Sequence, residues 1–355
     1  MGYAARPGME VPCCPGLRPD IEDKALKKIS VLALAGYLLF LTTGAALAQS
    51  RPVIRFSFGS GWNALPAIVA IERGFFAQQG LTVSGMAVSS AAAVMQSIAV
   101  GSTDFATVPQ RTLLVMAAAK LPVTVISMNG WGTQLELVVR KGDKRVRSLR
   151  DLKGKKIAVG AASDAYPVLI RLLNAAKMRP SDVVIQPLPA ARLVTALKSK
   201  RADAVFAFRH FTSVLVQSKQ GRVVMDNARI VKALGRVGAT PLLVNNRLLK
   251  TQPKTVQKFV TAWVRALKYI QKDPRDAANL LRIYFHRQGV TVSNKLAASW
   301  IPMTRYDRYV WSRAAIADAE YNGWGLKAGK VLKIRPKLAG YIQNRFAVRA
   351  LKAAK

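Results

Sequence analysis

The chain has 355 residues, and its formal net charge is +37, from 55 lysines and arginines against 18 aspartates and glutamates. Hydrophobic residues make up 51% of it, which excludes a disordered or low-complexity protein and predicts a globular one. The basic residues are spread along the chain without a compact motif of mixed basic and aromatic residues, so nucleic acid is not an expected partner. We instead expect a solvated basic surface that steers anionic ligands.

The N-terminal segment is typical of a secretory signal peptide. Basic residues, the last of them Lys28, precede an apolar run over 29–41, and small residues follow as far as Ala48. This run is shorter than the roughly 20 apolar residues that span a membrane, which disfavours the alternative of an uncleaved anchor. We therefore expect residues 1–48 to be removed on export and the mature protein to lie in the periplasm.

Residues that could carry chemistry are scarce. Cys13 and Cys14, the only cysteines, lie in the expected signal peptide, which excludes disulfides, a thiol nucleophile, cysteine metal ligands and a lipid anchor from the mature chain. His210 and His286 are isolated in the sequence, and no GxSxG, HExxH or P-loop motif occurs. We expect a protein that is not an enzyme and has no cofactor and no metal.

From residue 53 onward, short apolar runs alternate with longer segments of helical pattern. This alternation predicts crossover units and a mainly parallel sheet. In the first part of the chain we expect strands over 53–58, 81–88, 105–108, 123–128 and 135–139, and helices over 65–76, 91–99 and 111–119.

The same pattern starts again after a charged turn region at 148–156. Here we expect strands over 156–160, 183–188 and 204–208, and helices over 166–176, 192–198 and 211–217. A further strand over 242–244 is expected to return to the first part. The chain then becomes helical, with helices over 255–271, 275–284, 295–300 and 309–321. Two copies of one strand–loop–helix pattern predict two lobes.

Five segments, taken in order, carry a resemblance to a known family. They are LPAIVAIERGFFAQQGLTV (65–83), MQSIAVGSTDFATV (95–108), SLRDLKGKKIAVGAASDA (148–165), ALKSKRADAVFAF (196–208) and VQKFVTAWVRALKYIQKDPRDAANLL (256–281). The chain resembles the nitrate, sulfonate and taurine type of periplasmic substrate-binding proteins that feed ABC transporters. Arg201 departs from the family pattern, because a glycine is usual there. No single segment is specific, but the ordered set covers most of the expected mature chain.

The resemblance implies an α/β fold of the type II periplasmic-binding-protein kind. Two lobes with mainly parallel sheets, flanked by helices, would be joined by two hinge strands, and the C-terminal region would be helical. Residues 49–140 and 240–355 would form the first lobe and residues 141–239 the second. The resemblance further implies a monomer that captures a small anionic or zwitterionic metabolite, such as a sulfonate, nitrate or taurine, and delivers it to an ABC transporter permease.

Loops and helix N-termini at the carboxyl ends of the strands are expected to line the cleft between the lobes. The side chains and backbone groups expected to meet the ligand there are Ser60, Gly61, Trp62, Asn63, Ser89, Ser90, Thr107, Gln110, Trp131, Ser163, Asp164 and Tyr166. The basic candidates for an anion are Arg192, Arg209 and His210.

Several of these residues have structural alternatives. The tryptophans serve equally well in the core or at the hinge, and a serine before a helix serves as a cap without any ligand. Asp164 would repel an anion, so it is expected either to cap a helix or to bind the amino group of a zwitterion.

Three other functions stay open. One is a module that presents a ligand to a sensor or another envelope partner. A second is the binding or synthesis of a thiamine pyrimidine precursor on the same fold, although the enzymes of that kind use a cysteine-rich iron site. A third is polyanion binding through charge alone, which predicts a steep dependence on salt and no lobe closure with small molecules.

Overall fold

The computed structural model describes residues 53–353 except 89–90, 133, 161–162 and 236. The expected signal peptide, together with Ser89 and Ser90, therefore lies outside the described residues. The chain from residue 53 onward forms one compact unit. No helix among the described residues is both long and apolar enough to cross a membrane.

The first sheet has five strands in the order β2–β1–β3–β10–β4. β1 pairs in parallel with β2 and β3, whereas β10 runs antiparallel to both β3 and β4. Four strands therefore point in one direction, and β10 is reversed in their midst although it is last in sequence. The bounds are Ile54–Gly59 for β1, Val83–Val88 for β2, Phe105–Thr107 for β3, Val123–Trp131 for β4 and Ala239–Asn245 for β10.

The second sheet repeats this arrangement in the order β7–β6–β8–β5–β9. β6 pairs in parallel with β7 and β8, and β5 runs antiparallel to β8 and β9. The expected two-lobed α/β fold with mainly parallel sheets is thus confirmed, with one reversed strand in each sheet. The bounds are Leu135–Arg140 for β5, Lys156–Gly160 for β6, Val184–Leu188 for β7, Ala204–Phe208 for β8 and Gly221–Met225 for β9.

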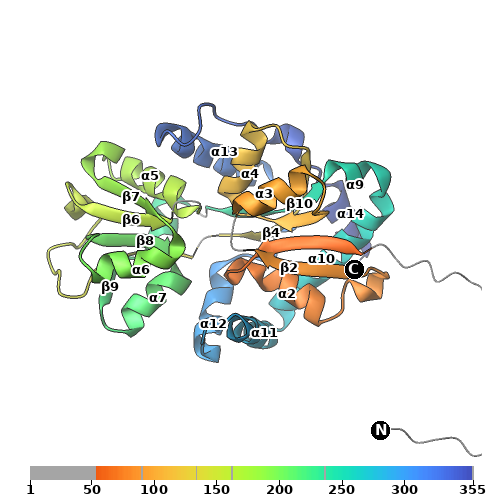
Figure 1. Cartoon of the computed structure of the whole chain (residues 1–355), viewed down its shortest axis with the longest axis horizontal. Helices are drawn as coiled ribbons and strands as arrows, with labels where there is room; N and C mark the ends of the chain where they lie inside the picture. The colour runs from red at the N-terminus through yellow and green to blue at the C-terminus, as the bar shows by residue number, and fades with distance from the viewer. Residues whose placement is uncertain (1–52, 89–90, 133, 161–162, 236, 354–355) are drawn as a thin grey trace, which may run out of the picture. The chain divides into compact units, whose positions relative to one another are not determined.

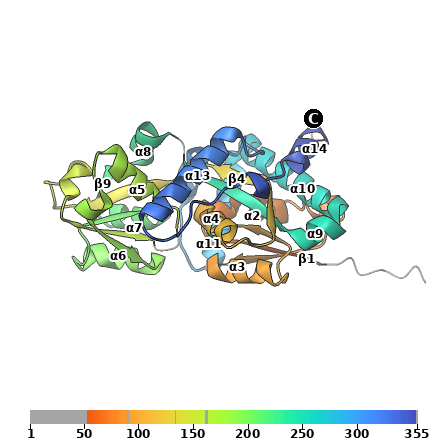
Figure 2. The ribbon, with the colours of Figure 1, turned by 90° about the horizontal axis from the view of Figure 1, so that it is seen from above.

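Helices flank both sheets (Figures 1 and 2). In the first part and the C-terminal region they are α2 Leu65–Glu72, α3 Ala91–Ala99, α4 Gln110–Ala118, α9 Asn246–Thr251, α10 Pro253–Lys272, α11 Pro274–Arg287, α12 Asn294–Trp300, α13 Arg313–Ala328 and α14 Arg345–Ala353. Beside the second sheet they are α5 Ala165–Ala175, α6 Ala190–Lys198, α7 Arg209–Gln217 and α8 Asn227–Leu234. Short 3-10 helices cover Trp62–Ala64 (η1), Ala77–Gln79, Arg150–Leu152, Pro180–Asp182, Ile301–Met303 and Ala339–Tyr341. α13 contacts both α4 and α5, so it packs on helices of both lobes.

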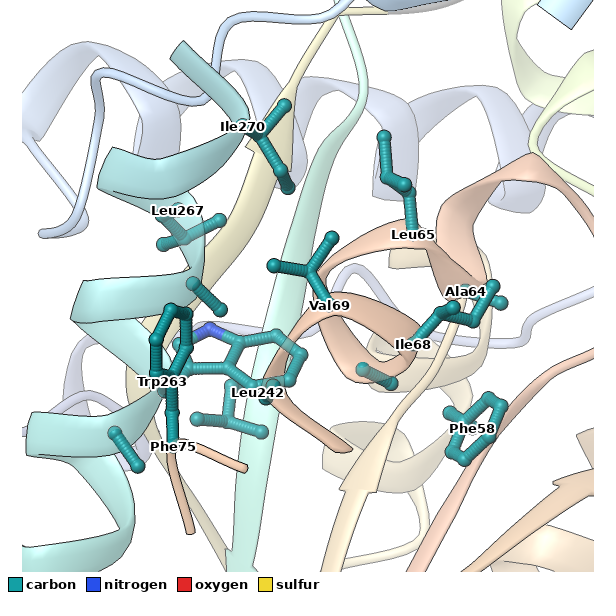
Figure 3. Packing of buried hydrophobic residues seen from close by; sticks show 14 of the residues in the cluster. Phe58, Ala64, Leu65, Ile68, Val69, Phe75, Leu242, Trp263, Leu267 and Ile270 are labelled. Carbon is teal, nitrogen blue, oxygen red and sulfur yellow. The ribbon is translucent and has the colours of Figure 1, made fainter. Parts of the chain in front are cut away.

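The core of the first lobe lies between its sheet and the helices α2, α10 and α11. Trp263 of α10 is fully buried there, and Figure 3 shows it with Val69 of α2 and Leu242 of β10 around it. Its indole N–H donates to the carbonyl oxygen of Met128 at 2.9 Å. The ring of Phe259 stacks on that of Phe105 with centroids 3.7 Å apart. These contacts hold α10 against the strands of the first sheet.

The chain crosses between the sheets before β5 and again between α8 and β10. β5 coincides with the strand expected over 135–139, but it pairs with β8 and β9 rather than with the strands of residues 49–140. This pairing favours a first crossing before Leu135, and the division into lobes remains a proposal. β9 and α8 have no counterpart among the expected elements.

Candidate functional site

A cleft of about 190 Å³ lies where loops from the two sheets face each other. The first sheet contributes the loop after β1 and the loop after β3, and the second contributes the loops after β6 and β8. Gly132 and Gly238, one at each crossing between the sheets, also line it. The walls therefore come from the carboxyl ends of parallel strands, where an open α/β sheet leaves a crevice for ligands.

Two glycines make these loops possible at equivalent places in the two sheets. A Cβ on Gly59, at the end of β1, would approach the amide nitrogen of the Asn63 side chain to 2.9 Å. A Cβ on Gly160, at the end of β6, would approach the hydroxyl of Ser163 to 2.6 Å, whereas in the structure that hydroxyl donates to the carbonyl oxygen of Gly160. The lack of a Cβ at each strand end therefore leaves room for the side chains of Asn63 and Ser163.

Aromatic rings line the cleft from both sides. Trp62, buried in the first lobe, lies with its ring centroid 6.2 Å from that of Phe208 at the end of β8. His210 follows, stacked near Phe208 at 5.9 Å and in contact with Phe211 at 4.0 Å. Val88, Val94, Val108 and Val168 add aliphatic surface. The cleft thus offers a largely apolar body with a flat aromatic wall.

Two buried polar atoms in this wall lack a hydrogen-bond partner among the described residues. They are the hydroxyl oxygen of Thr107 and Nδ1 of His210, and both residues line the cleft. Burial lowers the pKa of His210 to about 4, so the imidazole is neutral at pH 7. A buried polar group without a partner costs about 1–3 kcal/mol, so these atoms are suited to meet polar atoms of a ligand.

Asp164 joins the two lobes across the cleft. It stands at the start of α5, yet its carboxylate accepts backbone N–H bonds from Gln110 at 3.2 Å and Arg111 at 2.7 Å, at the N-terminus of α4 in the other lobe. Burial raises the pKa of Asp164 to about 6, although these two hydrogen bonds and the charge of Arg111 oppose the rise. The expectation that Asp164 caps its own helix is therefore wrong, because its carboxylate makes no capping bond to α5 and bonds instead to the N-terminus of α4. The protein's own carboxylate fills the place where a helix N-terminus would otherwise attract an anion.

Replacing Asp164 by asparagine is expected to change how stability depends on pH. An acid whose pKa is higher in the folded protein than in the unfolded chain holds its proton more tightly when folded, so stability falls as pH rises between the two values. Relative to Asp164→Asn, the free energy of unfolding of the parent protein should fall by about 3 kcal/mol between pH 4 and pH 6 and should not fall further at higher pH. The reason is that folding raises the pKa of Asp164 from 3.8 to about 6. Urea unfolding at each pH measures this difference. A difference that grew with pH would contradict the assignment. Asp151→Asn is a comparison of opposite sign, because backbone hydrogen bonds from Arg147 and Ser148 lower the pKa of Asp151.

The family model described as NMT1/THI5 like matches residues 62–277. The chain belongs to this family. The resemblance to periplasmic substrate-binding proteins of the sulfonate and taurine type is thereby confirmed. The taurine-binding periplasmic protein of Escherichia coli is 24% identical over 264 residues, which are 71% of this chain and 80% of that protein.

Solved structures show the same fold. The alkanesulfonate-binding protein SsuA of Xanthomonas axonopodis, bound to MOPS, has a TM-score of 0.68 at 18% identity and covers 83% of this chain and 99% of its own. The desulfurization enzyme DszB has a TM-score of 0.65 at 16% identity, with 86% of this chain and all of that chain covered. The fold of this NMT1/THI5-like protein therefore occurs in binding proteins and in an enzyme.

The structure places eight of the expected contact residues in the lining of the cleft: Ser60, Gly61, Trp62, Asn63, Thr107, Ser163, Asp164 and His210. Ser89 and Ser90 lie outside the described residues. Contact between any of these residues and a ligand stays a prediction. The sequence interpretation left out Phe208 and Phe211, whose apolar pattern indicated only a strand and a helix; the aromatic cluster FAFRHF was the available signal.

The two expected arginines lie outside this lining. Arg209 begins α7 and turns toward β5, where its guanidinium lies 3.5 Å from the carboxylate of Glu136 and 3.6 Å from the sulfur of Met303. Arg192 is exposed on α6 and lines a separate hollow on the second lobe. Neither guanidinium therefore lines the cleft that was expected to hold an anion.

Three other expected residues are engaged in contacts elsewhere. The side chain of Gln110 bonds to the carbonyl oxygen of Ala239 and accepts from Asn322. The hydroxyl of Tyr166 donates to the carbonyl oxygen of Gly329 at 3.2 Å. Trp131 exchanges backbone hydrogen bonds with Arg305, consistent with the hinge-packing alternative.

The electrostatics of the cleft follow from these placements. Asp164 is the one acidic side chain among its described lining residues, and they include no lysine or arginine. No group of three His, Cys, Asp or Glu side chains within the described residues could hold a metal ion. The described lining of the cleft is thus largely uncharged, with Asp164 as its acid.

Proposed function

We propose that this protein is the solute-binding component of an ABC importer, which captures a small organic ligand in the periplasm and delivers it to a permease. The observation that carries the proposal is the cleft, because its walls come from loops of both sheets. A ligand that touches both lobes binds their closed arrangement more tightly and shifts the population toward it. Family membership and the similarity to a taurine-binding periplasmic protein support the proposal.

The ligand class that we propose is an organic sulfonate, or a related acid or zwitterion, with an apolar body. Trp62, Phe208 and Phe211 would cover that body, and uncharged donors such as Ser60 and Asn63 would meet the acid group. Asp164 could pair with an amino group, as a zwitterion requires. A small inorganic anion such as nitrate finds no cationic side chain among the described lining residues, so it fits less well.

A series of linear alkanesulfonates is expected to stabilise the protein more as the chain lengthens. Each additional CH₂ group buried against the aromatic wall contributes about 0.8 kcal/mol, or about fourfold in affinity, until the cleft is full. Thermal-shift titrations and calorimetry measure this trend, since binding to the folded state raises stability. Nitrate is expected to give no shift at the same concentrations.

A matched pair of variants sharpens this experiment. Phe211→Ala should flatten the dependence on chain length, because Phe211 lines the cleft. Val216→Ala, on an exposed position of the same helix, should leave it unchanged. Affinity that is independent of chain length, or tight binding of nitrate, would refute the proposed ligand class. If no member of the series binds, the capture of small organic acids itself is contradicted.

We further propose that the ligand leaves the cleft chemically unchanged. His210 is neutral, and the described lining residues include no cysteine and no second histidine that could share proton transfer. Recovery of intact ligand by mass spectrometry after long incubation is the expected result. Crosslinking in the cell envelope should then identify a permease rather than a sensor.

A further inference from the structure

A group of basic residues lies at the edge of the second sheet that is opposite the cleft. β6 and β8 run toward the cleft, since Ser163 and Phe208 at their carboxyl ends line it. Their amino ends therefore lie at the far edge. β5 runs antiparallel to β8, with Leu135 paired to Phe208, so its last residue, Arg140, also lies at that far edge. The loop from β5 to β6, yellow at the left of Figure 1, belongs to this edge.

A hollow of about 370 Å³ opens at this far edge. Its walls come from the end of β5 and from the C-terminal ends of α6 and α7, and the basic residues among them are Arg140, Lys141, Lys198 and Lys219. Arg140 pairs with Asp203 at 3.1 Å. The three lysines are exposed and make no ion pair among the described residues. We call this feature the basic hollow.

The loops around the basic hollow add further positive charge. Exposed cations on the same edge include Lys144, Arg147, Lys153, Arg179, Lys200 and Arg201. Four acids lie in these loops, and each is held in local contacts. Asp151 and Asp182 accept from the backbone of neighbouring residues, Asp143 pairs with Arg145, and Asp203 pairs with Arg140. The far edge is therefore a strongly positive surface with an indentation in it.

Three lysines at this edge have a left-handed backbone conformation. Lys177, Lys200 and Lys219 follow the ends of α5, α6 and α7 and have positive φ angles of 58°, 59° and 56°. In this left-handed conformation glycine is favoured after a helix, and a lysine is strained. Lys120 and Lys330, after α4 and α13, have the same conformation with φ angles of 54° and 58°, so this use of lysine extends beyond the far edge. At the far edge it places three exposed cations close to the ends of neighbouring helices.

We propose that this edge binds the phosphate head groups of anionic phospholipids, with one phosphate in the basic hollow. Several basic loops at one end of a domain suit a flat anionic surface. The loops 141–155, 176–183, 199–203 and 218–220 contain no aromatic residue on which a nucleic-acid base could stack. Because the cleft lies at the opposite edge, a protein adsorbed in this way keeps its cleft open. The inference rests on the proposed periplasmic location and is independent of the proposed ligand.

The test uses the protein as isolated from the envelope of producing cells, with its N-terminus determined by mass spectrometry. Vesicles of phosphatidylcholine mixed with phosphatidylglycerol should bind it, and vesicles of phosphatidylcholine alone should not. The triple variant Lys141→Glu, Lys198→Glu, Lys219→Glu should lower the partition coefficient about a hundredfold or more, since each lysine near an anionic surface contributes about fivefold. Raising the salt concentration should release the parent protein.

The matched control reverses the charge of three lysines that are exposed on α9 and α10, in the triple variant Lys250→Glu, Lys254→Glu, Lys258→Glu. It changes the net charge equally and should bind vesicles far better than the first triple. Equal loss in both triples would overturn the proposal, because net charge alone would then explain binding. A third triple variant replaces the same three hollow lysines by glutamine, which removes the charge without reversing it. Circular dichroism of each variant shows whether it is still folded.

Two further binding experiments distinguish lipid head groups from free phosphate and from nucleic acid. Inorganic phosphate at millimolar levels should compete only weakly with vesicles, because one phosphate lacks the surrounding surface. Complete competition by inorganic phosphate would overturn the assignment to lipid. Tighter binding to a single-stranded oligonucleotide than to vesicles, lost in the same triple variant, would overturn it as well.

Discussion

Replacing Arg171 by methionine is expected to lower the free energy of unfolding by about 3–5 kcal/mol. Arg171 is 6% exposed, and its guanidinium donates to Asp318 and to Asn322, both at 2.7 Å. It also lies 4.7 Å above the ring of Tyr321. Without the cation, the carboxylate of Asp318, only 11% exposed, would keep just the backbone N–H of Gly238 as a hydrogen-bond partner among the described residues. A buried charge left in this way is strongly destabilising.

Urea unfolding of a small set of variants checks this prediction. The double variant Arg171→Met, Asp318→Leu should recover much of the loss, because no unpaired charge remains in the interior. Arg287→Met is the matched control, since Arg287 pairs with Glu72 at an exposed site and should cost less than about 1 kcal/mol. A single Arg171 variant as stable as this control would show that the buried network is not needed.

The network also bears on how the two lobes are linked. Arg171 lies on α5 beside the second sheet, and its partners Asp318 and Asn322 lie on α13. Asn322 also donates to the side chain of Gln110 on α4, beside the first sheet. α13 is therefore tied by side-chain hydrogen bonds to a helix of each lobe.

Replacing Trp263 by alanine is expected to cost about 3–5 kcal/mol of folding stability. The indole is fully buried among the aromatic rings of the first core, 5.7 Å from Phe56 and 6.5 Å from Phe259. Removing it leaves a cavity between α10 and the sheet and takes the donor from the carbonyl oxygen of Met128. Chemical unfolding followed by circular dichroism measures the loss.

Two comparisons separate the causes of that loss. Trp263→Phe keeps most of the aromatic volume and should cost about 1–3 kcal/mol, the range for a buried group left without its hydrogen bond. Trp324→Ala removes a partly buried indole on α13 and should cost less than Trp263→Ala. If all three variants unfold at the same denaturant concentration, the close packing of this core does not limit stability.

Much of the fold could be predicted because its strands are short apolar runs separated by turn residues. The runs 53–58, 156–160 and 204–208 agree with β1, β6 and β8 within one residue. β9 and α8 were missed because their exposed faces carry polar and charged residues. Asp226 between them was the available signal, since its carboxylate caps α8 by accepting from the backbone of Arg229.

The loops of the site were more predictable than its charges. Residues that follow strand ends, such as Gly61 and Ser163, lie in the cleft because topology alone puts them there. The direction of Arg209 depends on Glu136, a single acid in the buried strand β5, whose pKa is raised by burial while Thr212 and Arg209 oppose the rise. Such a pairing joins residues far apart in sequence, and no local pattern reveals it.

The position of β10 has a consequence for the order of folding. β10 separates β3 from β4, but the ribosome makes it only after all the strands of the second sheet. The second sheet is contiguous in sequence from β5 to β9, so it can form while β3 and β4 still lack their common neighbour. Pairing between segments so distant is slow. The nascent first lobe therefore stays incomplete until residues 239–245 emerge from the ribosome and supply the strand between β3 and β4.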